Sequence, residues 1–187
     1  MRRPRNLLGP QGMGGLVSLW GQSSLIRSIQ YGTTVAVGAA TATATITAVD
    51  TNNACLFYLG CSSNQSATYG HWAGACVLTN STTVTTNYDA ATDTRILDFC
   101  VVEFQTGLIK SRQAFVVTCV NAATATATIT AVDTKKAQIL FDGMTTYDGA
   151  NVQYGRVTLT NATTVTLVRG STDSYTTRIF GYVIEYF

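Results

Sequence analysis

The side chains that could do chemistry are few: one histidine, five cysteines and ten carboxylates among 187 residues. A catalytic triad needs a nucleophile, a base and an acid that orients the base. The only histidine, His71, stands in the segment Tyr69-Gly70-His71-Trp72, and the chain has no Gly-x-Ser-x-Gly nucleophile motif. Asp50 and Asp133 each follow a strand-like run, where a carboxylate typically caps a turn. We therefore predict no catalytic residues and no enzyme.

A metal site is equally poorly supported. Zinc would need Cys55, Cys61, His71 and Cys76 together, yet no Cys-x-x-Cys pair, the usual spacing in such sites, is present. The sequence therefore predicts no metal and no cofactor. The cysteines are odd in number, and most stand in apolar runs. We expect buried free thiols, which are typical of a protein that folds in a reducing cytoplasm.

Two polar loops, 61–72 and 142–154, are the best candidates for binding. Aromatic rings beside amides and carboxylates suit a sugar, which offers a flat apolar face and paired hydroxyls, and they suit a protein contact equally well. Because function tends to concentrate in variable loops, we predict a receptor, glycan or partner contact there. The candidate contact residues are Asn64, Tyr69, His71, Trp72, Tyr147, Asp148 and Tyr154.

The elements that must position these loops are β-strands. The chain contains 32 threonines, and only 12% of its residues are charged. From residue 41 to 48, Thr alternates with Ala or Ile, the period of a half-buried strand. The predicted fold class is all-β, an antiparallel sandwich or jelly roll. The expected strands are 29–37, 41–49, 54–60, 74–79, 82–86, 94–104, 113–120, 124–132, 136–141, 152–160, 163–168 and 176–187.

An internal repeat organises the chain. The matching segments are 39–51 with 122–134, 78–85 with 159–166, and 94–96 with 177–179. We therefore expect two tandem sandwiches, the first repeat at 28–105 and the second repeat at 106–187. A unit of about 80 residues has a marginal core. Association with further copies would also cover exposed strand edges, so we expect a homo-oligomer, with a trimer as the leading form.

Residues 1–27 lie outside the repeat and form a basic arm. This segment carries a charge of +4, whereas 28–105 carry −4 and 106–187 carry +2. The asymmetry indicates docking on an acidic surface. Nucleic acid is not predicted, because the arginines lack lysine clusters and interleaved aromatics. The anchoring residues are Arg2, Arg3, Arg5, Leu16, Leu19, Trp20 and Arg27.

Neither a signal peptide nor a membrane span is expected. Glycines and a proline interrupt the apolar stretch that follows the first arginines, so no signal-peptide core forms. Residues 28–49 are uncharged, but within them Thr alternates with Ala or Ile, whereas a membrane helix is apolar on all sides.

Both repeats resemble modules of tailed-bacteriophage structural proteins. The resemblance rests on the string Ala-Thr-Ala-Thr-Ile-Thr-Ala-Val-Asp-Thr, the apolar strand after it, the string Leu-Thr-Asn-x-Thr-Thr-Val-Thr, and the closing Val101-Val102-Glu103-Phe104. It covers about 160 of the 187 residues and leaves out the arm. It implies a non-enzymatic β-module in a virion, often oligomeric and held by an N-terminal segment.

Three functions are therefore weighed. The leading hypothesis is a tail-fibre or tail-associated adhesin component, assembled in the bacterial cytoplasm and anchored by its arm to a tail adaptor or the portal. A capsid decoration protein is the second hypothesis. The third is a soluble lectin-like module that binds a host surface glycan.

Overall fold

The computed structural model describes residues 25–64, 73–89, 93–146, 154–172 and 174–187, and the prediction of an all-β fold is confirmed. Antiparallel strands dominate these residues, which contain no helix that could cross a membrane. The strands of the first repeat are β1 (Ile26–Val37), β2 (Thr41–Thr45), β3 (Ala54–Ser63), β4 (Ala75–Asn80), β5 (Thr83–Asn87) and β6 (Thr94–Phe104). Those of the second repeat are β7 (Ile109–Cys119), β8 (Thr124–Thr128), β9 (Ala137–Thr146), β10 (Gly155–Asn161), β11 (Thr164–Arg169) and β12 (Thr177–Tyr186).

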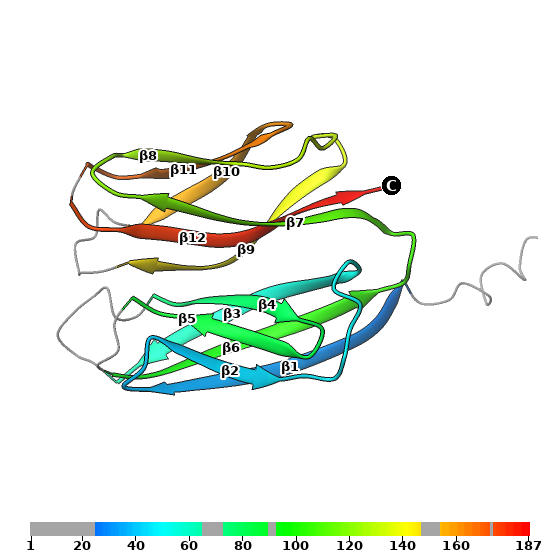
Figure 1. Ribbon diagram of the computed structural model, residues 1–187, viewed down its shortest axis with the longest axis horizontal. Helices are drawn as coiled ribbons and strands as arrows, with labels where there is room; N and C mark the ends of the chain where they lie inside the picture. Colours follow the sequence, from blue (N-terminus) through cyan, green and yellow to red (C-terminus); the bar gives the residue numbers. More distant parts are fainter. Residues whose placement is uncertain (1–24, 65–72, 90–92, 147–153, 173) are drawn as a thin grey trace, which may run out of the picture.

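Strand pairing follows the internal repeat. The first repeat pairs its strands in the orders β1-β6-β3 and β2-β5-β4, and the second in the equivalent orders β7-β12-β9 and β8-β11-β10. One cross-repeat pairing, β4 with β9, joins two of these sheets into a six-stranded sheet. In Figure 1 the second repeat lies above the first, and β9 is its strand drawn nearest the first repeat.

A buried glutamate holds one end of the first repeat together. The carboxylate of Glu103 in β6 accepts hydrogen bonds from the Asp50 backbone N–H at 2.9 Å and from Ser28 Oγ at 3.1 Å. It also forms an ion pair with Arg27 at 3.1 Å. Arg27, expected in the anchoring arm, therefore lies in β1 and binds within its own repeat.

The second repeat uses the same device. Glu185 accepts hydrogen bonds from the Asp133 backbone N–H at 2.9 Å, from Ser111 Oγ at 3.3 Å and from Lys110 Nζ at 2.8 Å. The hydrogen bond from Lys110 is the main cause that lowers the pKa of Glu185. Lys110 thus stands in the place of Arg27, which confirms that Arg27 belongs to the repeated unit.

The Thr/Ala strand is shorter than its sequence pattern predicts. Within β2 the threonines face solvent and the alanines face the core, as expected. The regular strand ends at Thr45, whereas the pattern predicted a strand to residue 49. Beyond it, Ile46 and Val49 are both buried, so the two-residue alternation is lost. Their N–H groups bond to backbone carbonyls of the β4–β5 turn.

Each repeat pairs a glycine with a phenylalanine across two strands, but in opposite orders. In the first repeat Gly32 of β1 faces Phe99 of β6, and a Cβ on Gly32 would lie 2.4 Å from the Phe99 ring. In the second repeat Phe115 occupies the first strand and Gly181 the second. In both repeats the phenylalanine ring packs over the glycine. The pair therefore fills the same space in each core, although the ring comes from a different strand.

The matching Thr-Arg-Ile strings face opposite ways. Arg95 is 1% exposed, forms an ion pair with Asp93 at 3.2 Å and lies over the ring of Tyr88. Arg178 points to the other side of its sheet and pairs with Asp89 of the first repeat at 2.8 Å. The spacing from the threonine of the string to the buried glutamate is one residue shorter in the second repeat. A one-residue shift moves every side chain to the other face of a sheet.

The two repeats share a core. Tyr182 and Ile184 of β12 are buried in the same apolar cluster as Leu56 and Leu78 of the first repeat. Beside this cluster, Ala75 of β4 pairs with Gly143 of β9. The two strands approach so closely that a Cβ on Gly143 would lie 2.3 Å from the Gly74 carbonyl oxygen.

Gly143→Ala tests this junction, with Gly60→Ala as its matched control. Both glycines have positive φ, +111° and +144°, so both substitutions incur backbone strain of about 1–3 kcal/mol. A Cβ on Gly60 would meet nothing within 4 Å, whereas one on Gly143 would strike the Gly74–Ala75 backbone. In urea unfolding of dilute protein, we expect Gly143→Ala to lower the free energy of unfolding by about 1–3 kcal/mol more than Gly60→Ala does. Equal losses would contradict a tight junction.

Candidate functional site

The residues considered for a metal or catalytic role that the structure describes are cysteines and turn aspartates, and His71 lies outside the described residues. All five cysteines are free thiols, and four of them are buried. Burial raises the pKa of Cys55 and of Cys61 to about 11, so both thiols are protonated at neutral pH and are poor nucleophiles. Among the described residues, no three His, Cys, Asp or Glu side chains gather to form a metal site.

Asp50 and Asp133 cap turns, as predicted. The Asp50 carboxylate accepts the backbone N–H of Asn52 at 3.0 Å, and Asp133 accepts that of Lys135 at 2.9 Å. The two aspartates occupy equivalent turns of different repeats, and each also donates its own N–H to the buried glutamate of that repeat.

Two of the predicted contact residues lie in the described structure. Asn64 is exposed, and its Oδ1 accepts the backbone N–H of Thr94 at 3.2 Å, which extends the β3–β6 pairing. Tyr154 is 49% exposed and lies immediately before β10. The remaining predicted residues lie outside the described residues: Arg2, Arg3, Arg5, Leu16, Leu19, Trp20, Tyr69, His71, Trp72, Tyr147 and Asp148.

Tyr154 lines an aromatic pocket where the repeats meet. This junction pocket has a volume of about 250 Å³ and includes Tyr58, Phe141, Met144 and Gly74. The rings of Tyr58 and Phe141 pack edge to face with centroids 6.3 Å apart. Ala73 and Tyr154, which directly follow the undescribed stretches 65–72 and 147–153, both line it. The two loops singled out from the sequence therefore end at one pocket.

A buried carboxyl lies at the same junction. Asp142 of β9 is fully buried, and neither of its oxygens has a hydrogen-bond partner among the described residues. Burial raises its pKa well above the usual range, and the nearby charge of Arg112 opposes this shift. The Arg112 guanidinium lies 3.6 Å from the centroid of the Tyr182 ring. Asp142 is therefore a buried acid at the junction, and its surroundings favour the protonated form.

The outer face of the β1-β6-β3 sheet exposes several large apolar side chains, and no other described strand covers it. In β1 the large side chains point outward, with Tyr31 75% and Val37 72% exposed, while the small or polar residues Thr34 and Ala36 point into the core. Alternation alone would have placed the larger residues inside. We call this surface the β1 face; its exposed apolar residues are Ile29, Tyr31, Val35, Val37, Leu59 and Ile96.

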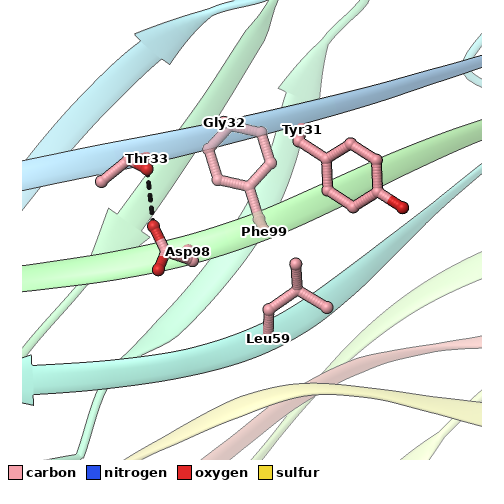
Figure 2. A pocket seen from close by; sticks show the side chains of 6 residues that line it. All are labelled: Tyr31, Gly32, Thr33, Leu59, Asp98 and Phe99. Carbon is pink, nitrogen blue, oxygen red and sulfur yellow. Dashed lines mark hydrogen bonds between the residues drawn. The ribbon is translucent and has the colours of Figure 1, made fainter.

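A shallow depression of about 360 Å³ lies at the centre of the β1 face (Figure 2). Tyr31 and Leu59 border it, and the Phe99 ring closes its floor beneath Gly32. Its one carboxylate, Asp98, accepts a hydrogen bond from Thr33 Oγ at 2.5 Å. The depression therefore offers apolar walls with one exposed negative charge. None of these residues was singled out from the sequence, because alternation in β1 predicts its larger residues on the core side and only the structure shows them outside.

The chain has no match among protein-family models, curated proteins or solved structures. The fold defines the class of protein, an all-β protein built from antiparallel sheets.

Asp142→Asn tests the buried acid. A raised pKa means that folding favours the protonated form, so the stability from Asp142 is full below the usual carboxyl pKa, near 4, and is lost as pH rises through its folded-state pKa. We therefore expect the variant to unfold about 2–4 °C higher than the natural chain at pH 7, and the difference to vanish near pH 4.

Thermal melts of dilute protein at both pH values measure this difference, and Asp98→Asn, which removes an exposed carboxylate, is the control. A lower melting temperature for Asp142→Asn at pH 7 would show instead that Arg112 stabilises the ionised carboxylate.

Proposed function

We propose that the chain is a non-enzymatic structural protein of a tailed-bacteriophage virion, a tail-fibre or tail-associated adhesin component. The β1 face carries this proposal. It exposes large apolar side chains on a regular sheet, and such patches mark surfaces that other protein covers. A protein that works as one part of an assembly needs such a surface.

The basic arm supplies the anchor in this proposal. Residues 1–27 carry a charge of +4, and virion surfaces rich in carboxylates would attract them. Since Arg27 is bound to Glu103 within the first repeat, the remaining arginines Arg2, Arg3 and Arg5 are left to make the contact. Leu16, Leu19 and Trp20 would fill pockets on the same partner, either a tail adaptor, the portal or the capsid.

Glycan binding is a second candidate, and the junction pocket favours it. Tyr58, Phe141 and Tyr154 give the pocket apolar walls, and the tyrosine hydroxyls provide polar groups. Stacking of sugar rings on aromatic side chains beside hydrogen-bonding groups suits such a surface. This activity is compatible with an adhesin, since a tail component that reaches the host has a receptor to bind.

Labelling of purified particles tests the structural proposal. We expect immunogold against the chain to mark phage tails, with tens of copies per particle. Hundreds of copies on heads would replace the tail assignment with the decoration assignment, and unlabelled particles would contradict both.

The combined variant Arg2→Glu, Arg3→Glu, Arg5→Glu should lose attachment to particles because its arm is repelled by acidic surfaces. Lys135→Glu, which reverses the charge of an exposed turn residue of the second repeat, is the control for charge reversal outside the arm.

A glycan array tests the second candidate. Tyr154→Ala should reduce glycan binding about tenfold, because one stacking ring is removed from the pocket. Tyr31→Ala, which removes an exposed tyrosine from the β1 face, should leave binding unchanged. Equal binding by the natural chain and by Tyr154→Ala would exclude the junction pocket as the sugar site.

A further inference from the structure

The two repeats differ in what covers one sheet. The face of β7-β12-β9 that corresponds to the β1 face is packed against the first repeat, where Tyr182 and Ile184 enter the shared core. The β1 face itself has no such cover in the described structure. The clearest pair of equivalent positions is the bulge in the third strand of each repeat. Asp142 is fully buried there, whereas its counterpart Leu59 is 54% exposed.

Equivalent strand edges show the same contrast. The β4 edge of the first repeat pairs with β9 of the second through Ala75 and Gly143. Their counterparts are β10 and β3, which end their sheets with no further strand paired among the described residues. Gly143 is pressed against Gly74 and Ala75, while Gly60, its counterpart in β3, faces open space. Among the described residues, the counterparts of both strands of the internal contact, β10 in the second repeat and β3 in the first, therefore have an unpaired edge.

The charges at these two edges are complementary. In the internal contact, Ala75 of β4 pairs with Gly143 of β9, and Gly143 belongs to the bulge of β9 that lies opposite Phe180 of β12. Register places Arg156, Gly60 and Asp98 at the equivalent positions of β10, β3 and β6. An apolar pair inside the chain is therefore replaced by an exposed cation and an exposed anion, on either side of a glycine. Arg156 and Asp98 would then stand on the two strands that flank the glycine strand, as Ala75 and Phe180 do on β4 and β12, and their opposite charges would attract each other.

We propose that the β1 face binds a second copy of this chain, on the side of the second repeat that is formed by β9 and β10. The contact would have the same geometry that joins the first repeat to the second. Strand β10 of one copy would pair with β3 of the next, and Arg156 would meet Asp98 across Gly60. The contact is head to tail, so successive copies form a ring if the rotation per copy closes and an open series if it does not. A closed trimer is one such ring, and an open series of copies is a fibre. This inference goes beyond the proposed virion role and does not depend on it.

Charge reversal in the full-length chain tests the contact. Sedimentation velocity over a concentration series should show reversible association of the natural chain. Asp98→Arg and Arg156→Asp should each weaken it about tenfold, because like charges then face each other across the contact. The double variant Asp98→Arg, Arg156→Asp should recover the natural dissociation constant to within about threefold, since the pair is restored with its signs exchanged.

The controls separate this contact from any other. Lys135→Glu makes a comparable charge change on the exposed turn before β9, eight residues from Gly143, and should leave association unchanged. Circular dichroism of the single variants should match the natural chain, because both side chains are exposed. A natural chain that stays monomeric at every concentration would overturn the proposal. Association that neither single variant weakens, or that the double variant fails to restore, would overturn it equally.

Discussion

Three buried side chains of the second repeat, Ile109, Tyr182 and Ile184, belong to the hydrophobic core of the first, and the rest of the structure depends on this shared burial. A unit of about 80 residues buries too little apolar surface for a comfortable margin of stability. The first repeat gains part of its core from β12, while the adjoining β4 edge is occupied by β9 at Gly143. At the junction, strands of both repeats therefore form one sheet over a common core. Arg178 and Asp89 add an ion pair between the repeats.

The repeat conserves a frame more strictly than it conserves an interior. Glu103 and Glu185 each accept hydrogen bonds from a turn N–H, a strand serine and a basic side chain of their own repeat, at equivalent positions. Equivalent polar contacts therefore fix one end of both units. Between these ends the packing varies. The glycine and phenylalanine exchange strands, and a buried arginine comes from β6 in one unit and from β11 in the other. Volume and charge are kept at each location, although the residues that supply them change.

The β1 face follows from the same logic of units that cover one another. In the second repeat the equivalent sheet rests on its neighbour, so large side chains there are buried by tandem packing. In the first repeat nothing within the described chain fills this role, and β1 keeps tyrosine and valines on the outside. An all-β protein that exposes an apolar sheet face is suited to assembly. This is the physical basis for the proposed structural role, and the aromatic junction pocket offers a place for recognition at the end where both variable loops terminate.

The sequence by itself determined the strand content, the repeat and the turn caps, because these depend on local alternation and on residues close in the chain. The Thr/Ala alternation placed the faces of β2 correctly up to Ile46, and Asp50 and Asp133 cap the turns expected of them. Which face of each sheet is covered was decided only by tertiary structure. Matching strings place Arg95 inside and Arg178 at the junction, because one residue of spacing reverses the pleat. Likewise, Leu59 is exposed while Asp142 is buried, since burial depends on which repeat lies against the sheet, and no local pattern encodes that neighbour.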